Sequence, residues 1–149
     1  TLPIAPPPPD ATAAAVIHDR AERAIVREIN RVRRAHGLRT LTATRSLARI
    51  AHQHSVAMLR RNVVAHLSIG GRSLTMRVRA VGKHKRYGET LAFLPKGSGG
   101  ARRLVRLWMS SPVHRRVLAD PRLRRVGVGR VYGMMGSRRG HAITADFTS

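Results

Sequence analysis

The segment from Leu107 to Val131 constrains the fold more than any other part of the chain, because it combines a helix start, a helix stop and a strand. Ser111 stands where a helix N-cap is expected, and Pro112 follows at the first helical position, where a missing N–H costs nothing. The Asp-Pro pair at 120–121 ends that helix, since the residue before proline avoids the α region. The alternation at 126–131 (VGVGRV) then predicts a strand.

His114 lies in the first turn of this predicted helix. The positive end of the helix dipole disfavours an imidazolium there, and a neutral imidazole is the form that binds a metal or accepts a proton. A hydrogen-bonded structural histidine would show the same spacing, so both interpretations stay open at this point.

A large excess of positive charge marks the whole chain. Its 149 residues carry 29 Lys and Arg against 7 Asp and Glu, a formal net charge of +22. Such a surface attracts polyanions: nucleic acid, anionic lipid headgroups or acidic wall polymers. Only 3% of the residues are aromatic, which argues against a platform that stacks single-stranded bases. The 42% of hydrophobic residues predict a globular core, and no apolar run approaches the roughly 20 residues of a membrane span.

The chain contains no cysteine, which excludes a disulfide framework and any cysteine-ligated zinc site. It starts at Thr1, as it would after removal of a signal peptide or after artificial trimming. Four consecutive prolines within TLPIAPPPPD are typical of an extended tether. We therefore expect a Pro-rich tether over residues 1–15 and a single domain over residues 16–149.

Hydrophobic periodicity predicts the other elements. Apolar residues at helical spacing indicate a long helix over 11–36, which ends before Gly37. Thr44 is a suitable N-cap for a second helix over 45–62. The remaining predicted elements are helices at 73–80 and 101–109 and a final strand at 142–147, which forms an antiparallel hairpin with the strand at 126–131.

Histidines occur at two further places. His52 and His54 are two residues apart, so on a helix they point in divergent directions and do not form a metal-binding pair. We expect His54 to point inward or to lie at an interface, and His52 to be solvated. His66 follows an apolar run at a junction between helix and loop, and its position alone is a weak signal.

Glu89 is the only acid between Glu28 and Asp120. Gly88 and an apolar segment flank it, which indicates partial burial. A buried carboxylate needs a partner, and either an arginine or a histidine would serve.

In this order, these parts resemble the CAP superfamily, also called SCP domains, which includes cysteine-rich secretory proteins, antigen 5 and pathogenesis-related proteins. The resemblance is to its bacterial, cysteine-free branch and covers about residues 20–147. The matching pieces are IVREINRVRRAHGL, LARIAHQHSVAML leading to Ala65-His66-Leu67-Ser68, Arg77, Gly88-Glu89-Thr90-Leu91-Ala92, LWMSSPVHR at 107–115, Asp120-Pro121 and Val126-Gly127-Val128-Gly129.

This resemblance implies an α+β fold, an α-β-α sandwich with a small antiparallel sheet between helical layers. It implies a secreted or envelope-associated protein with a cleft formed by His66, Glu89 and His114. Two departures stand out: Thr90 occupies the place of the family's asparagine, and residues 69–71 offer no counterpart to its second cleft acid.

We expect a binding protein rather than an enzyme, because the sequence shows no nucleophile, base and orienting group in a recognisable arrangement. The expected ligands are lipid-like, sterol-like or anionic envelope molecules, and no cofactor is required. The alternative is a zinc-dependent hydrolase with His66, His114 and Glu89 as metal ligands. A weaker alternative is nucleic-acid binding driven by charge alone.

Overall fold

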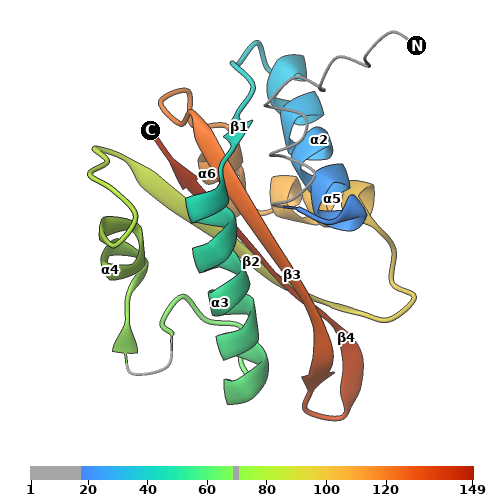
Figure 1. Ribbon diagram of the computed structural model, residues 1–149. Coiled ribbons are helices and arrows are strands. Elements are labelled where there is room, and N and C mark those ends of the chain that lie inside the picture. Colours follow the sequence, from blue (N-terminus) through green and yellow to red (C-terminus); the bar gives the residue numbers. More distant parts are fainter. Residues whose placement is uncertain (1–17, 69–70) are drawn as a thin grey trace, which may run out of the picture.

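The computed structural model describes residues 18–68 and 71–149 of the chain, arranged as helices packed on a single sheet (Figure 1). The tether expected over residues 1–15 lies outside this part. The elements in chain order are α2 (Arg20–Ala35), β1 (Thr42–Ala43), α3 (Arg45–Arg61), α4 (Leu74–Arg79), β2 (Tyr87–Pro95), α5 (Ala101–Ser110), α6 (Pro112–Leu118), β3 (Arg125–Met135) and β4 (Arg138–Thr148).

The sheet has four strands in the order β1-β3-β4-β2. The β3–β4 hairpin is antiparallel as predicted, and β2 pairs with the far edge of β4, also antiparallel. Only β1 runs parallel to its neighbour, with Thr42 opposite Arg125, so the sheet is mixed rather than wholly antiparallel. Neither β1, whose two residues show no periodicity, nor β2 was predicted from the sequence.

Helices cover both faces of the sheet, which confirms the α-β-α sandwich (Figure 1). One face carries α3. The other carries α2, α5 and α6, whose apolar side chains form the main core with β3 and β4: Ile25, Ile29, Leu104, Val105, Trp108, Leu118, Val126, Val128, Ile143, Ala145 and Phe147. No helix within the described ranges is long and apolar enough to cross a membrane.

The glycines of the VGVG motif let α3 approach β3 closely. The intervening valines, Val126 and Val128, point into the main core on the opposite face. A Cβ atom on Gly127 would lie 2.1 Å from the backbone nitrogen of Ala48, and one on Gly129 would lie 2.2 Å from that of His52. Any side chain at these two positions would therefore push the helix off the sheet.

Side chains from the start of α2 complete the edge of β3 beyond the short β1. The Val128 N–H donates to Nε2 of His18 at 3.0 Å, and the Arg130 N–H donates to Oε1 of Glu22 at 2.9 Å. Both acceptors are buried. Burial lowers the pKa of His18 and raises that of Glu22, although two backbone N–H groups that donate to Glu22 oppose its shift.

Two details of α2 concern its C-terminal end. The helix ends as expected, with His36 as C-cap and Gly37 at a φ of 70°. Arg33, in the last turn of the helix, is fully buried. Its guanidinium donates to the carbonyls of Arg39, Leu118 and Asp120. These hydrogen bonds compensate for burying a charged side chain.

We predict that Gly129→Ala destabilises the protein by roughly 3 kcal/mol, because α3 must move away from β3. Urea unfolding followed by circular dichroism measures this loss. Gly100→Ala is the matched control, since a Cβ atom there meets nothing within 4 Å. Equal losses in the two variants would contradict the close helix–strand contact.

We also predict that protonation of His18 weakens the folded state. Its pKa lies below the usual 6.5 in the folded protein, so the unfolded chain binds the proton first and stability falls as the pH drops below that value. His18→Gln keeps an acceptor for Val128 but does not titrate. Urea midpoints measured at several pH values should fall less steeply in this variant, and an unchanged pH profile would refute the assignment.

Candidate functional site

A buried pair of carboxyl groups forms the base of the site. Glu89 on β2 lies directly opposite Asp146 on β4 in the antiparallel register, on the face that carries α3. The relative exposure of Glu89 is 4% and that of Asp146 is 0%. Two carboxylates side by side in an apolar interior would repel each other, so this arrangement requires a compensating cation or a proton.

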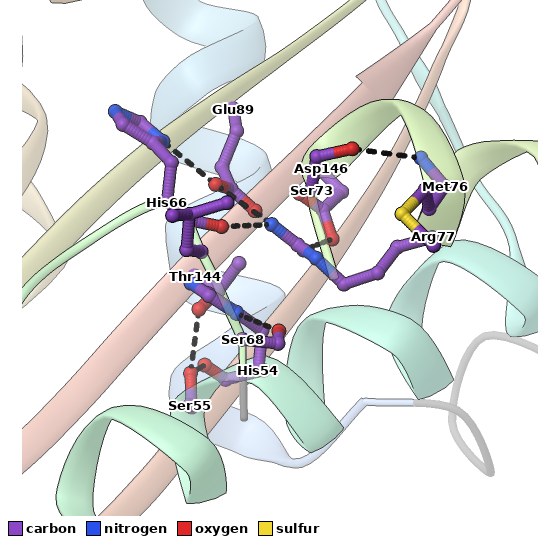
Figure 2. A network of polar contacts seen from close by, with 12 residues as sticks. His54, Ser55, His66, Ser68, Ser73, Met76, Arg77, Glu89, Thr144 and Asp146 are labelled. Carbon is purple, nitrogen blue, oxygen red and sulfur yellow. Dashed lines mark hydrogen bonds and ion pairs between the residues drawn. The ribbon is translucent and has the colours of Figure 1, made fainter. Parts of the chain in front are cut away.

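Arg77 on α4 supplies the cation. Its Nη1 donates to Oε2 of Glu89 at 2.7 Å, and its Nη2 donates to Oε1 at 3.1 Å (Figure 2). Nη2 also donates to the carbonyl of His66 at 2.8 Å. The forked guanidinium therefore joins the sheet to the loop that follows α3.

The two carboxyl groups titrate in opposite directions. Burial raises the pKa of Glu89, but hydrogen bonds from His66 and Arg77 outweigh it and lower the pKa to about 2. Burial and the neighbouring Glu89 charge raise the pKa of Asp146 well above its usual value. These opposite directions place the negative charge on Glu89 and favour a proton on Asp146. Oδ2 of Asp146 lies 3.6 Å from Nη1 of Arg77, and neither oxygen of Asp146 has a hydrogen-bond partner in the described part of the chain.

His66 is the solvent-facing partner of Glu89. Its Nδ1 lies 2.7 Å from Oε1 of Glu89, while 60% of its side chain remains exposed. The hydrogen bond to the carboxylate raises the pKa of His66. Glu89 therefore orients the ring and leaves its Nε2 edge turned away from the carboxylate.

His114 lies near His66. It sits in the first turn of α6, half-buried, and both burial and the positive charge of a protonated His66 lower its pKa. Ser111 occupies the predicted N-cap position, but its side chain makes no capping hydrogen bond. The structure therefore brings His66 and Glu89 into contact, and His114 is close enough to His66 for its pKa to be lowered by the charge of that ring.

His54 holds the loop that presents His66. Its Nε2 donates to the carbonyl of Ala65 at 2.7 Å, and its Nδ1 accepts from the Ser68 hydroxyl at 2.6 Å (Figure 2). Burial lowers its pKa, so the ring is neutral and uses both nitrogens. The inward orientation expected for His54 is confirmed, and its role is to position the loop.

The sequence analysis missed Asp146 as a member of the site. Asp146 lies in the predicted final strand, but only the register with β2 brings it beside Glu89. A signal was present: an acid amid the apolar alternation of residues 142–147 needs a buried partner. For Glu89, both partners considered, arginine and histidine, are found together.

The hydrogen bonds of Glu89 limit its ability to bind a metal ion. Both oxygens of Glu89 already accept hydrogen bonds from Arg77 and His66, so Glu89 orients an imidazole and has no oxygen pair open for a metal ion. Within residues 18–68 and 71–149, no group of three or more His, Cys, Asp or Glu side chains is placed to hold a metal. A three-ligand zinc site does not fit this arrangement.

We predict that Glu89→Gln destabilises the protein by roughly 3–5 kcal/mol, because it leaves the Arg77 charge buried without its partner. Thermal and urea unfolding measure the loss. Glu28→Gln is the matched control, since it breaks the exposed pair with Arg31 and should change stability far less. Similar losses in both variants would contradict the central place of the buried pair.

Comparisons with known proteins agree with this architecture. Among solved structures, an outer surface protein of Borrelia burgdorferi matches with a TM-score of 0.73 and 17% identity over 87% of this chain and 93% of that one. An extracellular protein of Bacillus anthracis that contains an SCP domain matches with a TM-score of 0.73 and 25% identity, over 97% of this chain and 45% of that one. A venom allergen-like protein of Schistosoma mansoni matches with a TM-score of 0.63 and 15% identity, over 88% of this chain and 89% of that one.

The family of the chain follows from its amino-acid sequence. A search of curated protein sequences finds no match. The model of the cysteine-rich secretory protein family, named CAP, matches residues 26–147, which include every residue of the site described above. On that match, the chain belongs to the CAP family.

Proposed function

We propose that this chain is a secreted or envelope-associated binding protein, without enzymatic activity, that binds an anionic lipid-like ligand at the exposed apolar rim around His66 and His114. The observation that carries the proposal is that apolar side chains close to both histidines in sequence are exposed. Val64 is 43% exposed, Leu67 51% and Val113 65%. Large apolar side chains at such exposure mark a surface that contacts an apolar partner.

Cations border the same surface. Arg61 donates to the carbonyls of Leu67 and Ser68, which places a guanidinium beside the exposed loop. Arg115 and Arg116 follow His114 on α6 and are exposed. Apolar side chains next to arginines match an amphiphile whose charged head lies beside its acyl chain, as in an anionic phospholipid.

The contacts of the polar groups favour binding over catalysis. The Ser68 hydroxyl is engaged by His54, and the Ser110 hydroxyl donates to the carbonyl of Leu107. Glu89, with a pKa of about 2, is a weak base. A hydrolase would need an activated nucleophile beside His66 or His114, and these serines do not supply one.

The proposed location rests on the relatives. The Bacillus anthracis protein with an SCP domain is described as extracellular, and it shares 25% identity with this chain. An envelope surface also offers the anionic lipids and wall polymers that a chain of net charge +22 attracts.

We predict that the protein floats with vesicles of phosphatidylglycerol but not with vesicles of phosphatidylcholine, at physiological ionic strength. The double variant Leu67→Ser, Val113→Ser should bind about tenfold more weakly, because it removes apolar area that enters the lipid. The matched control is Tyr132→Ser with Met134→Ser, which removes side chains 52% and 46% exposed on the β3–β4 hairpin.

Four results would refute the proposal. Equal losses in both double variants would show that the rim has no special role. Loss of all binding at physiological salt would indicate attraction by charge alone, as would equal affinity for duplex DNA. Loss of vesicle binding on chelation with EDTA would point to a metal-dependent contact instead.

A further inference from the structure

A second basic surface lies between α3 and α4. A groove of about 410 Å³ runs between α3 and the segment that passes through α4. None of its lining residues is acidic, and four of them are arginines: Arg49, Arg60, Arg72 and Arg77. A concave surface with several arginines and no acid concentrates positive potential where an anion can enter.

The sequence of α3 builds one wall of this groove. Arg49, Gln53 and Arg60 fall on one side of the helix at helical spacing, and all three are exposed. Within residues 18–68 and 71–149, Arg49 and Arg60 form no ion pair. Their charges are therefore available to a ligand.

Arg77 contributes a guanidinium to the groove that hydrogen bonds hold in one position. Its side chain is 5% exposed, and Glu89 and the His66 carbonyl fix its two Nη groups. Its Nε is buried and has no hydrogen-bond partner in the described part of the chain. A buried N–H without an acceptor costs free energy, and an anion oxygen in the groove would satisfy it.

The rest of the lining limits the kind of anion. Ile50, Val56, Ala57 and Val81 contribute apolar surface between the arginines. A phosphate offers more oxygens to several guanidinium groups than a carboxylate, which has two. The volume leaves room for a small organic group attached to the phosphate, which the apolar side chains would contact.

We propose that the groove between α3 and α4 is a binding site for a phosphomonoester, with Arg77 as the phosphate-binding residue. Arg49 and Arg60, about 16 Å apart along α3, supply positive potential at the two ends of the groove. The groove borders the loop that carries His66 and Leu67, but its test substitutes Arg49 and Arg60, which are not part of the apolar rim. The outcome is therefore distinguishable from that of vesicle binding through Leu67 and Val113.

The test uses the whole chain and two soluble probes, inorganic phosphate and glycerol 3-phosphate, at constant ionic strength. NMR should show the Nε–H signal of Arg77 shifting with saturation on titration. Isothermal titration should show binding at least about tenfold weaker in Arg49→Gln, Arg60→Gln. The matched control is Arg34→Gln with Arg39→Gln, which removes the same charge from two exposed arginines outside the groove and should change affinity less than about twofold.

A further arm identifies the source of the phosphate. Vesicles of phosphatidic acid present a phosphomonoester on a lipid, and competition by glycerol 3-phosphate would show that both occupy the groove. A static Arg77 signal, or equal losses in the two double variants, would overturn the proposal and leave only unspecific attraction of anions. Because all the substituted arginines are exposed, thermal melts are expected to match the wild type.

Discussion

The buried ion pair between Arg77 and Glu89 is the interaction on which the rest of the site depends. It joins α4, the sheet and the loop that carries His66 through one guanidinium. Without that cation, Glu89 and Asp146 would be adjacent carboxyl groups in an apolar interior, and neither would remain ionised readily. With it, the charge settles on Glu89, whose second hydrogen bond fixes the ring of His66. A buried pair of this kind adds little net stability, but it specifies one arrangement of α4, the sheet and the loop that carries His66.

Close packing places these segments where the ion pair can form. Because Gly127 and Gly129 present no side chain, α3 lies directly on β3, and Ser55 of α3 donates to the Gly129 carbonyl at 2.7 Å. The same helix carries His54, which holds the following loop by both ring nitrogens. The close approach of α3 to β3 therefore fixes His54, and His54 fixes the loop that positions His66. The backbone motif and the polar site are parts of a single arrangement.

Local signals made much of this fold predictable. Proline and glycine marked the helix boundaries, alternation marked the hairpin, and the resemblance in motif order pointed to His66, Glu89 and His114. What escaped prediction depends on contacts between residues distant in sequence. Asp146 joins the site only through the register of β2 on β4. Arg33 is buried only because carbonyls at positions 118 and 120 reach it. A sequence pattern specifies which residues share a face, whereas register and tertiary approach decide which faces meet.

The contacts of the few acidic residues explain why the positive charge of the chain remains unpaired at its surface. Only 7 acids accompany 29 basic residues, and those in the described part all have defined contacts. They cap helices, complete the edge of β3, or pair with particular arginines: Asp19, Glu22, Glu28, Glu89, Asp120 and Asp146. The arginines left over on the surface consequently have few carboxylates to pair with. Their charge can be neutralised only by mobile ions or by an anionic partner, and release of those mobile ions favours binding of a polyvalent anion. Two kinds of surface then separate the possible anions: exposed apolar side chains beside arginines suit a lipid, and a groove of arginines around a buried N–H suits a compact phosphate.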